Sequence, residues 1–175
     1  MSRFVVVGTS GSGKTTVAAA IADRLGIPHV EIDGLFHQPD WQPTPDDELG
    51  AALSRATEGD GWVVDGNYTR TRPVTWPRAE TIVWLDYPKS LIMRRVTART
   101  LRRVLTRQEL WNGNREPWTN LYRLDPEQNI IRWAWTTYDA NRQKYLTAQD
   151  DPQWAHLDWV VHHSPDETET WLNSL

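Results

Sequence analysis

The chain has 175 residues, a formal net charge of −4 and no cysteine. This length fits one domain with a substantial hydrophobic core. The absence of cysteine excludes disulfides, thiol catalysis and cysteine-ligated zinc. No apolar run is long enough to cross a membrane or to form a signal peptide, so the sequence predicts a soluble, cytoplasmic protein without a membrane partner.

The basic residues are unevenly distributed along the chain. Seven lie between Tyr87 and Gln108, where no acidic residue occurs: Lys89, Arg94, Arg95, Arg99, Arg102, Arg103 and Arg107. The rest of the chain is therefore more acidic than the net charge suggests, which disfavours a broad nucleic-acid contact. The basic block predicts local binding of phosphate. Its alternatives are a solvated helix face and a nucleic-acid contact through this block alone.

Strand and helix patterns alternate along the sequence. Short apolar or β-branched runs predict strands at residues 3–7, 28–32, 62–65, 81–86 and 157–162. Helical patterns lie between and after them, at residues 14–26, 44–61, 88–105, 125–148 and 164–175. Thr44 and Ser164 are predicted helix caps, and Glu167 completes a capping box at Ser164. The alternation predicts an α/β fold in which helices cover both faces of a parallel sheet and ligands bind at the carboxyl ends of the strands.

The first strand and helix flank a phosphate-binding pattern. Residues 8–15 read GTSGSGKT and match GxxxxGK[ST] in the strand-then-helix context that this pattern requires. Glycines permit a close approach, so the backbone N–H groups of residues 10–15 can converge on phosphate beside the positive end of the helix. Lys14 would bridge the β- and γ-phosphates. The residues predicted to bind ATP in this loop are Gly8, Ser10, Gly11, Ser12, Gly13, Lys14, Thr15 and Thr16.

A metal site is predicted beside this loop. The Thr15 hydroxyl and a carboxylate at the end of a neighbouring strand would bind Mg²⁺, and Asp65 follows the apolar run WVV. The alternative is that Asp65 only forms a turn before Gly66. The chain has no NKxD motif, which disfavours a signalling GTPase.

Several segments resemble the nucleoside-monophosphate-kinase-like branch of P-loop proteins, which includes adenylate, shikimate and gluconate kinases. GWVVDGNYTR (61–70) is similar to the GFLLDGFPR segment of adenylate kinases, with one extra residue before the arginine. LDYPKSLIMRRVTAR (85–99) is similar to their LDxPxxLxxRLxxR helix. LFHQPDWQP (35–43) and ELWNGNREPW (109–118) further resemble small bacterial proteins often labelled topology modulation proteins.

This resemblance implies a three-layer P-loop NTPase fold whose five-stranded parallel sheet has the strand order 2-3-1-4-5. It also implies a single kinase domain over residues 1–175, with an acceptor-binding insertion at about 34–61 and a lid at about 94–118.

The resemblance places Arg95 and Arg99 in a lid that closes over ATP, where guanidinium groups would neutralise charge in the transition state. Arg102 and Arg103 fall within about 100° of them on a helical wheel. Arg115 lies in a Gly/Asn-rich segment suited to movement and is the predicted lid tip. A solvent-facing basic helix is the alternative for the whole group.

The acceptor is expected between the second and third strands. No lysine or arginine occurs between Arg24 and Arg55, so the phosphate of a nucleotide acceptor would meet carboxylates unless Arg70 reached across.

A hydroxyl acceptor needs a group that takes its proton. Asp33 stands at the expected end of the second strand, where shikimate- and gluconate-type kinases carry such a carboxylate. Phe36 and Trp41 would wall the site or stack on a planar ring. The alternatives are a turn-forming aspartate and two core aromatics.

These patterns together predict an ATP- and Mg²⁺-dependent kinase that moves the γ-phosphoryl group to a small acceptor, as a monomer or homodimer. The predicted catalytic residues are Lys14, Asp33, Arg95 and Arg99. The predicted substrate-binding residues are Asp33, Phe36, Trp41, Asp65, Arg70 and Arg115, and the metal ligands are Thr15 and Asp65. The alternatives are a nucleotide-dependent regulator that binds DNA or a protein partner through its basic block, and a plain ATPase.

Overall fold

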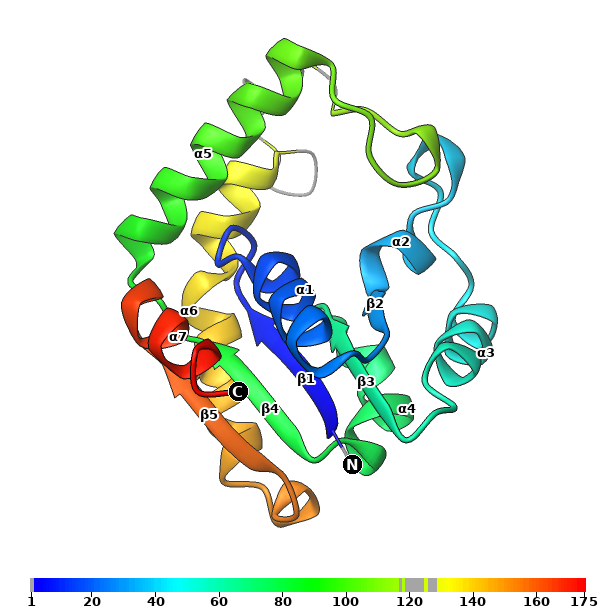
Figure 1. Ribbon diagram of the computed structural model, residues 1–175. Coiled ribbons are helices and arrows are strands. Elements are labelled where there is room, and N and C mark those ends of the chain that lie inside the picture. Colours follow the sequence, from blue (N-terminus) through cyan, green and yellow to red (C-terminus); the bar gives the residue numbers. More distant parts are fainter. Residues whose placement is uncertain (1, 117, 119–124, 126–128) are drawn as a thin grey trace.

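Five parallel strands form one sheet in a computed structural model that describes residues 2–116, 118, 125 and 129–175. The strands are β1 (Ser2–Gly8), β2 (His29–Glu31), β3 (Gly61–Asp65), β4 (Thr81–Leu85) and β5 (Asp158–His162). Their order is β2-β3-β1-β4-β5, which confirms the α/β fold and the predicted order 2-3-1-4-5 (Figure 1). All neighbouring strands pair in parallel, so their carboxyl ends share one edge.

Helices cover both faces of this sheet (Figure 1). They are α1 (Lys14–Leu25), α2 (Ile32–Phe36), α3 (Asp46–Ala56), α4 (Arg72–Thr75), α5 (Lys89–Thr106), α6 (Ile130–Gln149) and α7 (Pro165–Leu172). Helices α1 and α7 pack on one face, and α4 and α6 lie on the other. Among the described residues, no helix is both long and apolar enough to cross a membrane.

The strands alternate between two hydrophobic clusters. Val6, Val63 and Val83 belong to the cluster under α1 and α7. Their strand neighbours, such as Val5 and Val64, belong to the cluster that includes residues of α3 and α6. Because successive strand residues point to opposite faces, an apolar run buries both faces at once, which is typical of a parallel sheet covered by helices.

Of the two predicted helix caps, the structure confirms one and contradicts the other. Ser164 caps α7 as predicted, since its Oγ accepts from the Glu167 N–H at 3.2 Å. The predicted cap at Thr44 is wrong, because α3 begins after Pro45 and Thr44 does not cap it. Its hydroxyl donates to the Leu35 carbonyl at 2.7 Å and so ties the α2–α3 connection together. The described part of the penultimate helix begins at Ile130, where the Asn129 side chain accepts from two backbone N–H groups; residues 126–128 of the predicted start lie outside the described residues.

Replacing Leu53 tests the packing of α3. Leu53 is fully buried, and Leu53→Ala should lower the free energy of unfolding by about 2–5 kcal/mol, through lost burial and the cavity left behind. Leu105 is 67% exposed, so Leu105→Ala is the matched control and should change stability by no more than about 0.5 kcal/mol. Urea denaturation of both variants measures the difference. Equal losses would contradict the placement of α3 against the sheet.

Candidate active site

The phosphate-binding loop lies between β1 and α1 and packs against α5. Gly11 has a φ of +89°, and a Cβ there would stand 3.0 Å from the Val96 Cβ. Only glycine fits this approach of the loop to α5. Gly13 is the N-cap of α1 and has no side chain that could cap the helix, so the first backbone N–H groups of α1 are suited to an anion.

Lys14 is the buried cation of the site. Burial lowers the pKa of Lys14, while the charges of Asp33 and Asp65 act in the opposite direction. Arg99 adds to the lowering and Glu31 opposes it. The ammonium of Lys14 therefore lies within electrostatic reach of three carboxylates and one guanidinium, although these residues come from four different elements or loops.

Thr15 and Asp65 meet as the sequence placed them. The Thr15 hydroxyl donates to Asp65 Oδ2 at 2.6 Å, and Asp65 is buried. Glu31 Oε1 lies 3.3 Å from the same hydroxyl. His29 Nε2 is 3.1 Å from Asp65 Oδ1, and this hydrogen bond raises the pKa of His29. Three side-chain oxygens therefore gather at the start of α1.

Glu31 was not predicted as a site residue. The second strand ends at Glu31, which pairs in register with Asp65, so Glu31 is the strand-end carboxylate. Asp33 instead lies in the first turn of α2, which corrects its predicted place at the end of the strand. The apolar run PHVEI (28–32) predicts a strand here but does not show whether the strand ends at Glu31 or just before Asp33.

Asn67 is a second residue that the sequence analysis missed. Its Oδ1 accepts from the Gly8 N–H at 3.2 Å and from the Tyr145 hydroxyl at 2.9 Å, and its Nδ2 donates to the Gly8 carbonyl. The Lys144 ammonium donates to the Asn67 carbonyl at 3.1 Å, and burial lowers the pKa of Lys144 to about 8. Asn67 thus clamps the end of β1 where the phosphate-binding loop begins.

One face of α5 presents arginines to this loop. Arg95 Nη1 donates to the Ser12 carbonyl at 3.1 Å, and Arg99 Nη2 donates to Ser10 Oγ at 3.1 Å. Arg103, one turn further, forms an ion pair of 3.0 Å with Glu116. This i, i+4, i+8 spacing keeps the three on one face.

Arg102, which the helical wheel groups with the others, is exposed. Burial lowers the pKa of Arg99, and the neighbouring charge of Arg103 adds to that lowering.

The acceptor side is centred on Asp33. The Tyr68 hydroxyl donates to Asp33 Oδ1 at 2.7 Å and lies 3.4 Å from His37 Nε2. Burial raises the pKa of Tyr68 far above its ordinary value, and the Asp33 charge acts in the same direction, so the phenol keeps its proton. Asp33 is thereby held by a fixed donor on the turn after β3.

Phe36 and Arg70 flank this carboxylate. The Phe36 ring lies 4.7 Å from the Tyr68 ring, and the Arg70 guanidinium lies 5.4 Å from the Phe36 ring centre. Arg70 Nη1 also donates to Asp46 Oδ1 at 2.6 Å. Arg70 therefore does reach the segment after β2, but a carboxylate already engages it.

Trp41, in the segment that follows α2, contacts Arg115 in the loop that follows α5. The Trp41 Nε1–H donates to the Arg115 carbonyl at 3.3 Å. The Arg115 side chain is half exposed and pairs with Glu109 at 3.6 Å within its own loop. The structure thus brings Arg115 to the acceptor side through its backbone, with its guanidinium near the surface.

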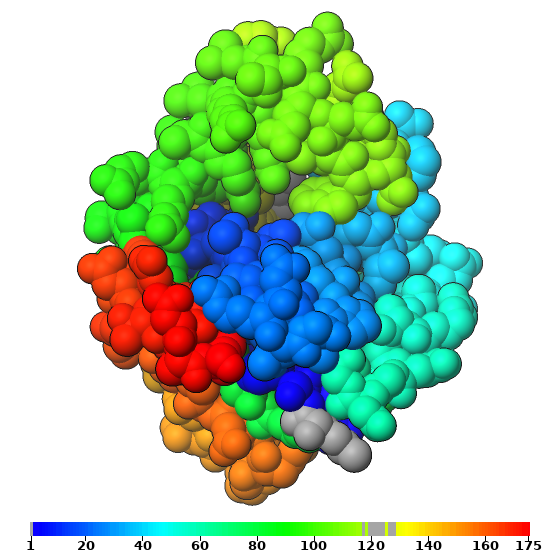
Figure 2. Space-filling view, viewed as in Figure 1, coloured from blue at the N-terminus to red at the C-terminus, as the bar shows by residue number. Residues whose placement is uncertain are grey.

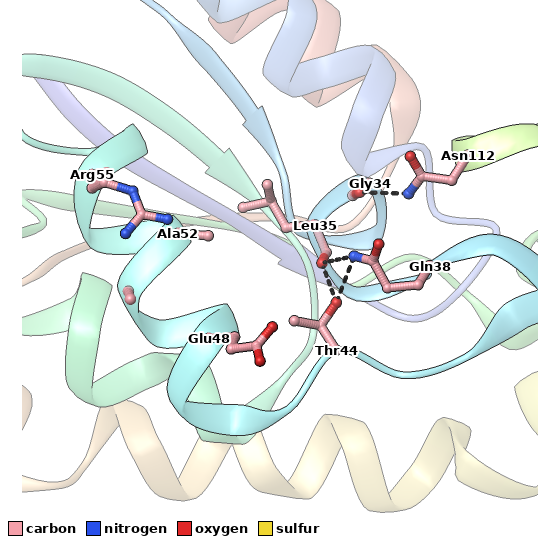
Figure 3. Close-up of a pocket in the computed structure, with 9 residues that line it drawn as sticks. Gly34, Leu35, Gln38, Thr44, Glu48, Ala52, Arg55 and Asn112 are labelled. Atoms are coloured by element: carbon pink, nitrogen blue, oxygen red, sulfur yellow. Dashed lines mark hydrogen bonds between the residues drawn. The ribbon is translucent and has the colours of Figure 1, made fainter.

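The candidate site opens as a hollow on the molecular surface. Figure 2 shows it between the N-terminal residues around α1 and the mass of α5 with its following loop. A pocket of about 390 Å³ lies between α2 and α3. Its lining, drawn in Figure 3, includes Leu35, Gln38, Glu48 and Arg55 but not Asp33.

A glycine-rich loop with Lys14 and Thr15, at the carboxyl edge of a sheet of this order, defines a P-loop nucleotide-binding fold. The sequence profile of the family described as "ATPase family associated with various cellular activities (AAA)" matches residues 4–108, which is more than half of the chain.

Curated proteins with similar sequences indicate which P-loop proteins this chain is related to. The chain is 31% identical over 148 residues to a cytidylate kinase of Pyrobaculum aerophilum, a match that covers 71% of this chain and 77% of that protein. It is 42% identical over 53 residues to an adenylate kinase of Mycobacterium sp. (strain MCS), covering 30% of this chain and 28% of the relative. The chain spans only about a third or less of the length of three adenylate kinases that it matches.

A solved shikimate kinase from Acinetobacter baumannii, in complex with shikimate, superimposes with a TM-score of 0.58 at 15% identity, covering 99% of this chain and 90% of that one. At this identity the likeness concerns the fold. The chain belongs to the P-loop NTPases that the AAA profile describes and, within them, to the nucleoside-monophosphate-kinase-like P-loop kinases.

His37 should give the protein a specific loss of stability in acid. Burial lowers the pKa of His37 below its ordinary value of 6.5, so the unfolded chain binds this proton more readily than the folded chain. Stability is therefore lost as the pH falls through about 6.5. The urea midpoint should fall more between pH 8 and pH 5.5 in the wild type than in His37→Asn. Equal slopes in the two proteins would contradict the burial of a neutral imidazole.

Proposed function

We propose that this protein is an ATP- and Mg²⁺-dependent kinase that transfers the γ-phosphoryl group to a hydroxyl of a small acceptor. The observation that carries the proposal is the position of Asp33. This carboxylate is fixed by Tyr68 and lies close enough to Lys14 and Arg99 for its charge to act on the pKa of both. A proton acceptor therefore stands beside the groups suited to hold the phosphates.

The donor would bind at the P-loop. The free N–H groups at the start of α1 and the Lys14 ammonium are suited to the phosphate oxygens, since all of them carry positive charge toward the same point. Arg95 and Arg99 approach the loop from α5 and would neutralise charge on the transferring group.

The oxygens at the start of α1 fit Mg²⁺. This ion prefers one or two carboxylates together with phosphate oxygens and water, and Thr15, Asp65 and Glu31 offer such a donor set. Among the described residues, no group of three or more histidine and carboxylate side chains that could hold a metal by itself occurs. When bound, Mg²⁺ supplies charge neutralisation on the phosphate oxygens.

Asp33 would take the proton of the acceptor hydroxyl. The hydroxyl oxygen attacks the γ-phosphorus, the bond from that phosphorus to the bridging oxygen breaks, and ADP leaves. Because Oδ1 of Asp33 accepts from Tyr68, Oδ2 is the oxygen that we assign to the acceptor proton. Positioning and charge neutralisation carry most of such a transfer, so no covalent nucleophile is required.

The charges on the acceptor side favour a hydroxyl acceptor without a phosphate dianion. Asp33 and Glu31 lie there, Arg70 is already paired with Asp46, and residues 25–54 contain no lysine or arginine. The kinases that the chain resembles include nucleotide kinases and shikimate kinases, so their names leave the acceptor open. We expect the protein to act in the cytoplasm, as a monomer or homodimer.

The alternative of a DNA-binding regulator loses part of its basis. Arg95, Arg99 and Arg103 turn toward the protein, and Lys89 pairs with Asp139 at 3.0 Å. The basic block therefore offers a duplex fewer outward charges than the sequence suggested.

An acceptor panel tests the kinase directly. ADP release from ATP and Mg²⁺ should rise at least about tenfold with one class among nucleosides, polyols and hydroxy acids, and less with nucleoside monophosphates, because of the carboxylates near Asp33. Lys14→Ala is the blank, since the substitution removes the cation that binds the phosphates. ATP binding without stimulated release by any compound would contradict the kinase assignment.

Asp33→Asn tests the proton acceptor. The acceptor-dependent kcat should fall by about 10²–10⁴, because an amide cannot take the proton, while the Kd for ATP should stay within about twofold. Asp47 is an exposed carboxylate on α3, and Asp47→Asn is the matched control. An unchanged kcat in Asp33→Asn would remove this role from Asp33.

A further inference from the structure

Two asparagines join the loop after α5 to the segment around α2. We call residues 110–116 the 110–116 loop and residues 32–44 the α2 segment. Asn114 is buried; its Oδ1 accepts from the Trp41 N–H at 3.0 Å and its Nδ2 donates to the Gln38 carbonyl at 2.9 Å. Asn112 Nδ2 donates to the His37 carbonyl at 2.6 Å and to the Gly34 carbonyl at 3.3 Å, the latter drawn in Figure 3. Side-chain amides thus satisfy backbone groups of a segment more than 70 residues earlier in the chain.

Trp111 is the side chain that these hydrogen bonds position. Its ring stacks on the His37 ring, with centroids 5.7 Å apart and planes 26° apart, and meets the Trp41 ring edge-on at 6.5 Å. A Cβ on Gly34 would stand 3.1 Å from Trp111 Cδ1, so the absence of a side chain at Gly34 makes room for the indole. His37 in turn reaches Asp33 through the Tyr68 hydroxyl. One imidazole and one phenol therefore separate Trp111 from the proposed proton acceptor.

The same loop also contacts the arginine face of α5. Glu116 pairs with Arg103 at 3.0 Å, and their side chains are only 6% and 17% exposed. The Arg103 guanidinium lies 6.0 Å from the Trp111 ring centre. In Figure 1 the chain that follows α5 accordingly crosses the top of the molecule toward α2. The 110–116 loop is thus attached both to the α2 segment and to α5.

We propose that Trp111 is a specificity-determining residue of the acceptor site, and that Asn112 and Asn114 are positioning residues that hold it against His37. The inference rests on the proposed function, because it needs an acceptor beside Asp33. Aromatic rings pack against flat or apolar faces. The acceptor class that fits this wall is a hydroxyl compound with a planar or apolar ring face, such as a nucleoside, in preference to an open-chain polyol.

The test compares Trp111→Ala, Trp111→Phe and Asn114→Ala with Trp133→Ala. Trp133 is an exposed tryptophan on α6, away from these contacts, and serves as the matched control. Acceptor binding is measured by calorimetry over nucleosides and polyols, turnover gives kcat and KM, and ATP binding is measured separately. Hydrogen exchange follows the 110–116 loop and the α2 segment.

Trp111→Ala should weaken acceptor binding and raise KM by about tenfold or more, with the Kd for ATP within about twofold. Trp111→Phe should restore most of the loss. Asn114→Ala should speed exchange in both segments together, because each segment loses the partner of its buried groups. Trp133→Ala should behave as the wild type.

Two outcomes would overturn the inference. The first is weaker ATP binding in Trp111→Ala with acceptor binding unchanged, which would assign the loop to the nucleotide. The second is faster exchange in only one segment of Asn114→Ala, which would mean that the amides do not hold the two together. If compounds bind in a Trp111-dependent way but none is phosphorylated, the kinase proposal fails and the acceptor-site wall stands.

Discussion

The parallel register of the first three strands is the constraint on which the candidate site depends. It places Val6 beside Asp65, and Asp65 beside Glu31, at the edge where the phosphate-binding loop starts. Because α1 begins at this same edge, the Thr15 hydroxyl meets both carboxylates. A slip of one residue in any strand would turn these side chains to the other face of the sheet. The apolar strand residues that bury both faces of the sheet therefore also fix the positions of Thr15, Asp65 and Glu31 at its carboxyl edge.

Burial of Lys14 shapes the electrostatics of this edge. A buried ammonium is costly unless negative charge lies nearby, and here Asp33, Asp65 and Glu31 supply it. The arginines of α5 concentrate positive charge. The charge of Arg103 lowers the pKa of Arg99, and the negative charge of Glu116 acts in the opposite direction. Such an arrangement suits a polyanionic ligand, whose charge would replace the compensation that side chains provide.

Two segments that lie far apart in the sequence are linked in this protein. The 110–116 loop belongs to the predicted lid, and the α2 segment belongs to the predicted acceptor insertion. The side-chain amides of Asn112 and Asn114 join them by hydrogen bonds to backbone groups of the α2 segment, and the Trp111 ring stacks on His37 of that segment. Under our proposals, a change in lid position is therefore also a change in the acceptor site.

The sequence by itself determined the sheet order through its family resemblance, the strands through their apolar runs, and the loop around Lys14 through its local pattern. It also paired Thr15 with Asp65, because a P-loop and a strand-end carboxylate must share the carboxyl edge of a parallel sheet. These features depend on short-range pattern or on topology, which the order of elements reveals.

Only the tertiary structure decided where Glu31 stands relative to Asp33, because the end of a three-residue strand is set by its hydrogen bonds to β3 and not by its own residues. It likewise decided that Asn67 clamps Gly8 and that Asn114 holds Trp41, since each hydrogen bond joins residues more than 50 positions apart. No local pattern encodes such partners. They follow from which polar groups remain to be satisfied once the chain has packed.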